Sequence, residues 1–221
     1  MATSLQNVRK ELLLRLGEEL GEYGFARKGE DFARKTVYGK DLIQAFFVPH
    51  PGKYLGVDLS IGVRHDAVED LVNAFTPGIP RKLKPWTETV GNRLDNMLGQ
   101  FMMWTIENEE QLKWGIRRML RTVRAVALPF FDRFSSLAEC LKVLALDGEE
   151  GSQFKSGEPG RAMAAVAAAF VLGNRGTFDE VVEYKARFLR EFCAGKELWE
   201  ARLPEFLALV EDLQRRWPAD L

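Results

Sequence analysis

Few residues of this chain have the type and spacing that catalytic chemistry needs. Histidine is the commonest general base, and the 221 residues include only His50 and His65. His50 lies between two prolines and His65 precedes Asp66, so we expect both side chains to be exposed, without a partner at metal-ligand spacing. Gly-x-Ser-x-Gly, His-Glu-x-x-His, phosphate-loop and dinucleotide-binding patterns do not occur. We therefore predict a protein that is not an enzyme and that uses no metal or cofactor.

Arginine is the charged residue with the most regular pattern, and it recurs on one predicted helix. Three of the four arginines there follow i, i+4, i+7 spacing, which places them on one helix face, and a tryptophan precedes them by one turn. Arginine and tryptophan are enriched at interface hot spots, because each combines a large contact area with directional donors. We predict a surface for an acidic protein partner that consists of Trp114, Arg117, Arg118, Arg121 and Arg124.

Two alternatives to this interface stay open. Residues 76–134 carry a net charge of +4, whereas residues 135–221 carry −4, so the arginines could pair within the chain. The candidate carboxylates are Glu180, Glu183 and Glu191. RNA is a weaker alternative, because four arginines on an acidic protein are a poor signal for a polyanion binder.

A second set of polar residues could line a cleft between sheet and helices. Asp58 and Ser60 share one face of a predicted strand, and Arg34 lies on another strand. An enzyme or a small-molecule-binding protein would use these three residues to line its cleft. Such a protein is the alternative to a protein-binding module. The glycines beside Asp58 and Ser60 are equally typical of a strand face that is solvated or closely packed under a helix.

Composition restricts the class of protein. The chain has 31 Lys plus Arg, 32 Asp plus Glu and 46% hydrophobic residues, which excludes disorder of the whole chain. A pI of about 6.2 disfavours a general nucleic-acid binder. The most apolar stretch, residues 162–172, is too short for a bilayer, and no signal peptide is recognised, so we predict a cytoplasmic protein without membrane contact. Cys140 and Cys193 lie in apolar contexts and are expected to be buried free thiols.

Hydrophobic periodicity predicts an α+β fold, with an N-terminal helix and an antiparallel β-meander followed by a C-terminal helical bundle. The expected strands are residues 32–38, 42–48, 55–63 and 100–106. The expected helices are residues 5–20, 108–126, 135–146, 159–172, 178–192 and 198–217, with a helical hairpin around residues 171–179. We predict a helix-plus-sheet region over residues 1–107 and a helical region over residues 108–221 that packs on it as one compact unit.

Local signals predict where some of these elements begin and end. Residues 66–75 are expected to form a short helix or an irregular connection, and residues 76–86, with three prolines, a long loop. Asn108 and Gln111 have the spacing of a helix capping box. Pro129 is expected to end the helix that follows.

Several short motifs resemble an uncharacterised bacterial domain family over roughly residues 5–146. They are the turn Gly24–Gly29, Phe32-x-Arg34, Ile43-Gln44, the strand Val57–Val63 and the helix end Leu128–Asp132. The resemblance implies a compact α+β bacterial protein and supplies no catalytic residues. Proteins of this kind are often toxin-immunity partners. The resemblance therefore implies an immunity or antitoxin protein that binds and neutralises a bacterial toxin, for which a secreted toxin domain is the candidate partner.

Overall fold

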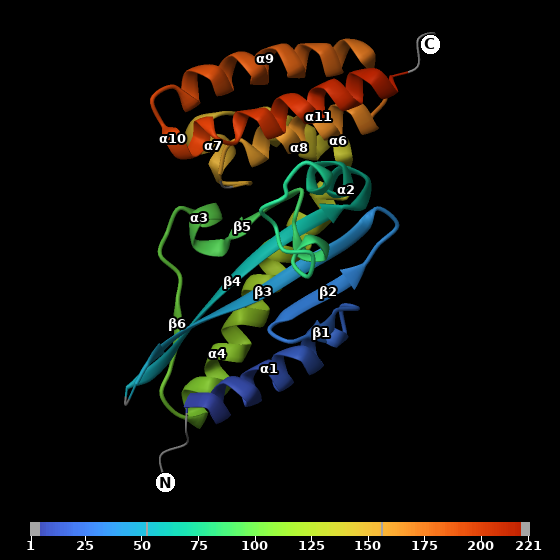
Figure 1. The fold of residues 1–221 in the computed structure, drawn as a ribbon. Coiled ribbons are helices and arrows are strands. Elements are labelled where there is room, and N and C mark those ends of the chain that lie inside the picture. Colours follow the sequence, from blue (N-terminus) through green and yellow to red (C-terminus); the bar gives the residue numbers. More distant parts are fainter. Residues whose placement is uncertain (1–4, 52, 156, 218–221) are drawn as a thin grey trace. The chain divides into compact units, whose positions relative to one another are not determined.

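The computed structural model describes residues 5–51, 53–155 and 157–217 (Figure 1). It contains an N-terminal helix, an antiparallel six-stranded sheet and then several helices, which confirms the predicted α+β class. In the described part of the chain, no helix is long and apolar enough to cross a membrane.

Internal contacts divide the chain into two compact units. Unit 1 comprises residues 1–63 and 91–133, and unit 2 comprises residues 64–90 and 134–221. Each unit therefore draws on both sides of residue 107. In unit 1, α4 (Glu109–Thr122) packs against α1 (Leu5–Gly21), and in unit 2, α8 (Gly160–Val171) packs against α2 (Asp66–Ala74).

The sheet is a meander in the order β1-β2-β3-β4-β5, and β6 also pairs with β4. Its strands are β1 (Ala26–Lys28), β2 (Asp31–Lys35), β3 (Gly39–His50), β4 (Tyr54–His65), β5 (Val90–Arg93) and β6 (Trp104–Ile106). Phe32 lies opposite Ile43 in the β2–β3 ladder, and Val57 lies opposite Trp104 in the β4–β6 ladder. The three-residue β1 and the four-residue β5 were not predicted, because a strand of three or four residues is too short to display the alternating hydrophobic pattern.

Strand β4 is buried on both faces rather than on one. Asp58 and Ser60 are only 3% and 6% exposed, so their face is a packed one. At Gly56, which shares that face, a Cβ atom would lie 2.7 Å from the sulfur of Met103. The glycine at position 56 is thus explained by close packing.

The predicted fourth strand, residues 100–106, is largely wrong. Only Trp104–Ile106 pairs with β4, and Phe101 is 80% exposed. Before it, α3 (Leu94–Leu98) ends at Gly99, which is left-handed with a φ of 62°, and the Gln100 N–H donates to the Asp95 carbonyl. This helix end directs the chain away from β4 until Met103 returns to it.

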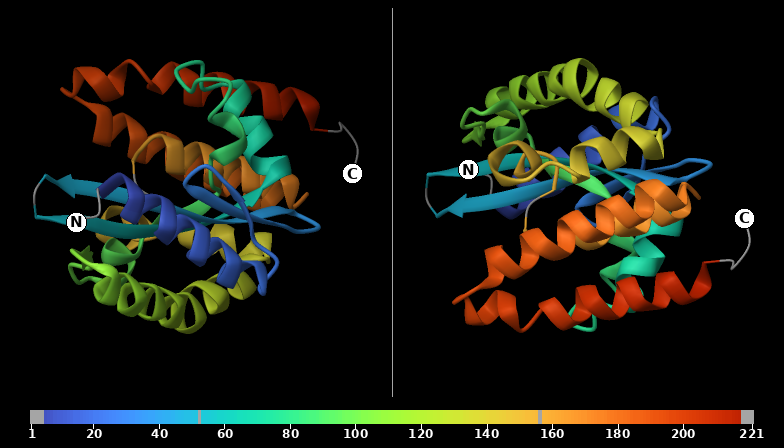
Figure 2. Two further views of the ribbon diagram at one scale, coloured as in Figure 1. Left: turned by 90° about the horizontal axis from the view of Figure 1, so that it is seen from below. Right: turned by 90° about the horizontal axis from the view of Figure 1, so that it is seen from above.

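The capping signal at the start of α4 is confirmed in part. The Gln111 N–H donates to Asn108 Oδ1 at 2.9 Å, as in a capping box. The Gln111 side chain accepts from the backbone N–H of Glu107, one residue before the cap. The left view of Figure 2 shows α1 next to α4, against which it packs.

The expectation that Pro129 ends the helix beginning after Asn108 is wrong, because the helical path continues past it. A π-helical turn, Val123–Ala127, joins α4 to α5 (Leu128–Phe134), and the Leu128 N–H bonds the Val123 carbonyl five residues back. Pro129 then occupies the first turn of α5, where its missing N–H is tolerated.

Unit 2 is built around α8. Its alanine-rich sequence is buried almost throughout, since small side chains let neighbouring helices approach, and α2, α6, α9 and α11 all contact it. Figure 1 shows α9 and α11 side by side over α8. The α8–α9 pair confirms the predicted hairpin. The remaining elements are α6 (Leu137–Leu144), α7 (Gly148–Ser152), α9 (Arg175–Cys193), α10 (Glu197–Glu200), α11 (Leu203–Arg216) and a 3-10 turn, Lys84–Trp86.

Candidate functional site

The arginine residues predicted as an interface lie on the exposed side of α4 and of the π-turn after it. The opposite side of α4, which includes Leu112, Ile116 and Met119, is buried. Trp114 is 46% exposed and all four arginines are exposed. We call the set Trp114, Arg117, Arg118, Arg121 and Arg124 the arginine face.

Two arginines of this face are held by aromatic side chains. The Arg118 guanidinium lies 4.9 Å from the ring centre of Trp114. Arg124 donates from Nε to the Tyr23 hydroxyl at 2.6 Å and lies 5.7 Å from that ring centre. Arg124 belongs to the π-turn, so the straight-helix spacing used in the sequence analysis does not describe its position. Tyr23 is a member of the site that sequence reasoning missed.

No carboxylate neutralises the arginine face within unit 1. Among its described residues, none of the four arginines forms an ion pair. Glu109 of α4 pairs instead with Arg15 of α1, at 3.0 Å. Glu180, Glu183 and Glu191, the alternative partners, belong to unit 2. Apart from Nε of Arg124, which donates to the Tyr23 hydroxyl, the guanidinium groups therefore keep their donors available for a partner.

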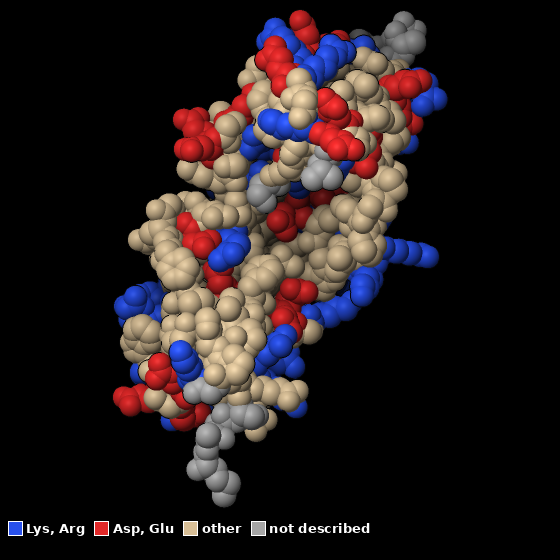
Figure 3. Space-filling view, turned by 60° about the vertical axis from the view of Figure 1, so that its left-hand side comes forward, with Lys and Arg blue, Asp and Glu red and all other residues tan. Residues whose placement is uncertain are grey.

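A groove beside the arginine face carries both signs of charge. It has a volume of about 410 Å³ and is lined by Arg15, Glu18, Glu19, Lys113, Ile116 and Arg117. Basic and acidic side chains are similarly interspersed on the face of the molecule in Figure 3. Specificity at such a surface depends on the placement of individual charges more than on a single-sign field.

Arg34 belongs to a buried ion pair rather than to an open cleft. Its Nε lies 2.8 Å and its Nη2 2.7 Å from Asp41 Oδ2, and Asp41 is fully buried. The Tyr38 hydroxyl donates to the other Asp41 oxygen at 2.7 Å, and burial together with this contact raises the pKa of Tyr38. Arg34 also lies over the rings of Phe25 and Phe131. Arg34 and Asp41 are direct partners in the β2–β3 register, so the hairpin turn between them was the signal that could have shown the pair.

Asp58 has a different partner, so the structure does not join it to Arg34. Its Oδ2 lies 2.6 Å from Nη2 of Arg93, which also reaches Asp95 at 3.0 Å. Burial raises the pKa of Asp58, the Arg93 guanidinium lowers it, and Asp95 raises it further. Ser60 is buried two residues along the same strand. The three residues named for a cleft therefore lie in the packed sheet.

The expectation that both histidines are exposed is wrong for His65. This residue is 5% exposed at the end of β4, and its Nε2 lies 2.9 Å from the Phe134 carbonyl. Cys140 Sγ lies 3.5 Å from the same nitrogen. A carbonyl can only accept, so Nε2 carries the proton and offers the thiol no base. His50 is half-buried and its ring lies 4.1 Å from that of Tyr54.

Both cysteines are buried and free, as expected. In the described residues, no group of three or more His, Cys, Asp or Glu side chains is placed to hold a metal ion.

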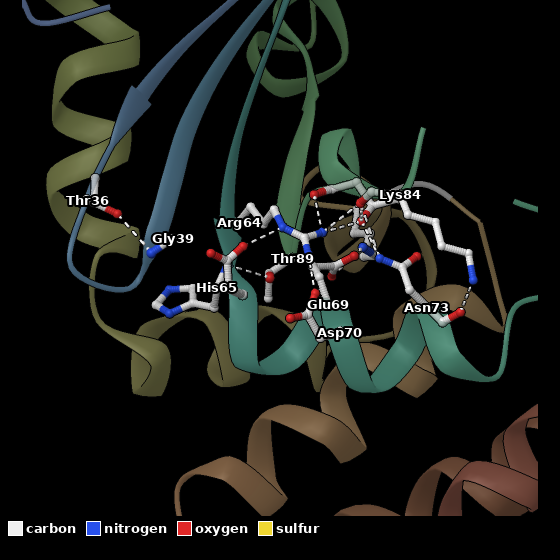
Figure 4. A network of polar contacts seen from close by, with 12 residues as sticks. Thr36, Gly39, Arg64, His65, Glu69, Asp70, Asn73, Lys84 and Thr89 are labelled. Carbon is white, nitrogen blue, oxygen red and sulfur yellow. Dashed lines mark hydrogen bonds and ion pairs between the residues drawn. The ribbon is translucent and has the colours of Figure 1, made fainter. Parts of the chain in front are cut away.

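A buried arginine network organises the proline-containing loop in unit 2 (Figure 4). Arg64 is 4% exposed and contacts Asp66 and Asp70, each at 2.6 Å. Its Nη1 donates to the Lys84 carbonyl at 2.9 Å and to the Thr87 hydroxyl at 2.7 Å. All three guanidinium nitrogens are therefore occupied, so Arg64 is a structural residue that fixes the loop to β4 and α2.

One lysine supplies the positive charge for two carboxylates near this network. Glu69 is 1% exposed, and its Oε1 lies 3.6 Å from Nζ of Lys155, which also donates to the Glu88 carbonyl. Burial raises the pKa of Glu88, Lys155 opposes the rise, and the Glu69 carboxylate adds to it. Ionised Glu88 therefore destabilises the folded protein.

The variant Glu88→Gln is expected to gain stability relative to the original protein as the pH rises. Because the pKa of Glu88 is raised in the folded state, this group stabilises the fold fully at a pH below 4.5, its ordinary pKa. The stabilisation is lost as the pH rises through the folded-state pKa. Glutamine removes that loss. Urea unfolding between acidic and neutral pH measures the effect, with Glu22→Gln at an exposed position as the control. If the difference in the free energy of unfolding between Glu88→Gln and the original protein did not change with pH, the raised pKa of Glu88 would be contradicted.

Comparison with family models, with curated proteins and with solved structures gives no match to this chain. The resemblance to a bacterial domain family therefore stays a prediction, and the functional argument depends on the site itself.

Proposed function

We propose that this protein is a non-enzymatic binding module whose arginine face engages an acidic surface of a protein partner. The observation that carries the proposal is the exposure of Trp114 and four arginines without a carboxylate partner among the described residues of unit 1. Exposed guanidinium groups can form bidentate contacts with carboxylates without first breaking an internal ion pair. Trp114 adds a large contact area at low entropy cost.

The partner class that we propose is a bacterial toxin domain, which makes the protein a cytoplasmic immunity or antitoxin protein. Such a protein needs a firm scaffold and a complementary surface rather than catalytic groups. The arginine face has such a scaffold, because α4 is capped at Asn108 and packs against α1 along its buried side. The family resemblance supplies the biological context.

The test uses the product of the gene that neighbours this one. We expect it to co-purify with the full chain as a stoichiometric complex, and we expect co-expression of the chain to restore growth of cells that produce it. If no complex forms and the cells are not protected, the immunity function is contradicted. A complex that forms without protecting cells would leave a binding module and exclude toxin neutralisation.

A further inference from the structure

The groove of about 410 Å³ beside the arginine face lies between two helices of unit 1, α1 and α4. These helices run in the same direction, because Arg15 of α1 pairs with Glu109 in the first turn of α4, and Tyr23, just after α1, bonds Arg124, just after α4. Each helix therefore forms one wall of the groove. Arg15, which also lines it, is already neutralised by Glu109 and by Glu11 of its own helix, at 2.6 Å.

The two walls carry opposite charges. Glu18 and Glu19 line the groove from α1, and Lys113 and Arg117, which are one helical turn apart, line it from α4. All four side chains are exposed. Ile116, also in the lining, is only 6% exposed. The groove thus separates an acidic wall on α1 from a basic wall on α4, and the basic wall continues into the arginine face.

Direct contact does not neutralise these charges. In the described part of unit 1, no ion pair involves Glu18, Glu19 or Arg117, and Lys113 reaches only Glu109 of its own helix, at 3.7 Å. The carboxylates of α1 and the cations of α4 are therefore both available to a binding partner.

A partner surface that is acidic throughout is disfavoured at this groove. A groove of about 410 Å³ is about 9 Å across if it is taken as a sphere, which is close to the distance of about 8 Å over which physiological salt screens exposed charges. A carboxylate bound at Arg117 would therefore be repelled by Glu18 and Glu19. A basic side chain on the same partner would be attracted to them instead.

We propose that Glu18 and Glu19 select the partner of the arginine face. The groove then accepts a protein surface that presents carboxylates to α4 and a lysine or arginine to α1. This inference rests on the proposed function and specifies the chemistry of its partner. A polyanion such as RNA has no basic group for the α1 wall and meets only its repulsion, so the same two residues discriminate against nucleic acid.

The first test measures binding of poly-L-glutamate, a uniformly acidic probe, to the full chain at low ionic strength. Glu18→Gln/Glu19→Gln is expected to bind it about tenfold or more tightly than the original protein, because the repulsion is removed. Both positions are exposed, so the fold should be retained.

A matched control is Glu149→Gln/Glu150→Gln, at two exposed positions in unit 2. It changes the net charge by the same amount and should leave the affinity for poly-L-glutamate within about threefold, since neither residue lines the groove. Equal gains in the two double variants would show an effect of total charge and would overturn the proposal. No gain in the Glu18→Gln/Glu19→Gln protein would overturn it as well.

The second test uses the product of the neighbouring gene. Glu18→Gln/Glu19→Gln is expected to bind this protein about tenfold more weakly than the original chain does, because the attraction for its basic group is lost. Unchanged or tighter binding, in a complex that Arg117→Glu/Arg121→Glu still disrupts, would overturn this inference and leave the proposed function intact. No binding by the original chain would contradict the proposed function and this inference with it.

Discussion

The double variant Arg117→Glu/Arg121→Glu is expected to weaken binding of the acidic partner about 100-fold or more, because close charge pairs at interfaces couple by about 1.5–7 kcal/mol each. Both arginines are exposed, and neither has a carboxylate partner in the part of unit 1 that the structure describes. The free energy of unfolding should therefore change by less than about 1 kcal/mol for the two surface substitutions together. Titration calorimetry and urea unfolding measure the two quantities.

A matched control is the charge reversal Arg81→Glu/Lys82→Glu, at two exposed positions in unit 2. It changes the net charge by the same amount and should leave partner affinity within about threefold, since neither residue belongs to the arginine face and exposed charges that do not contact the partner are screened by salt. Equal loss of binding in both double variants would show an effect of total charge. A large loss of stability in the Arg117→Glu/Arg121→Glu protein would instead support pairing of the arginines within the chain.

The variant Arg34→Met is expected to destabilise the protein by about 2–3 kcal/mol, because breaking a buried ion pair leaves a charge uncompensated. Asp41 is fully buried, and it would keep only the Tyr38 hydroxyl of the contacts described above. The Arg34 side chain is itself 28% exposed, which is why we take a value below the usual range of about 3–5 kcal/mol. Urea unfolding at neutral pH measures the loss.

Two further variants separate the charge from the packing of Arg34. Lys35→Met, at the exposed neighbouring position, should change the free energy of unfolding by less than about 0.5 kcal/mol. Arg34→Met/Asp41→Asn should recover about half of the loss of Arg34→Met, because the stranded carboxylate is gone. Failure to recover would mean that Arg34 acts through its contacts with Phe25 and Phe131 instead.

The sequence predicted the elements whose signals are local. Regularly spaced leucines defined α1, strict alternation defined the centre of β4, and the Asn108 cap marked the start of α4. The same reasoning placed the arginine face on the exposed side of its helix, since the buried residues of α4 follow helical spacing. A helix shows its exposed face in its own sequence.

Features that depend on tertiary contacts could not be predicted in this way. His65 is buried because the Phe134 carbonyl and Cys140, about 70 residues later in the chain, lie against it. Phe188 and Trp199 come from two helices, so their common pocket has no signal in either segment. The π-turn after α4 likewise follows from packing, and it changes the position of Arg124.

The most direct test of the proposed function is hydroxyl-radical footprinting of the full chain with and without its partner, read at individual tryptophans. Trp114 is 46% exposed in the arginine face, and Trp199 is half-buried in unit 2. We expect a stoichiometric complex to protect Trp114 strongly and to leave Trp199 unchanged. Unchanged reactivity of Trp114 in such a complex would contradict the assignment of the arginine face as the binding surface.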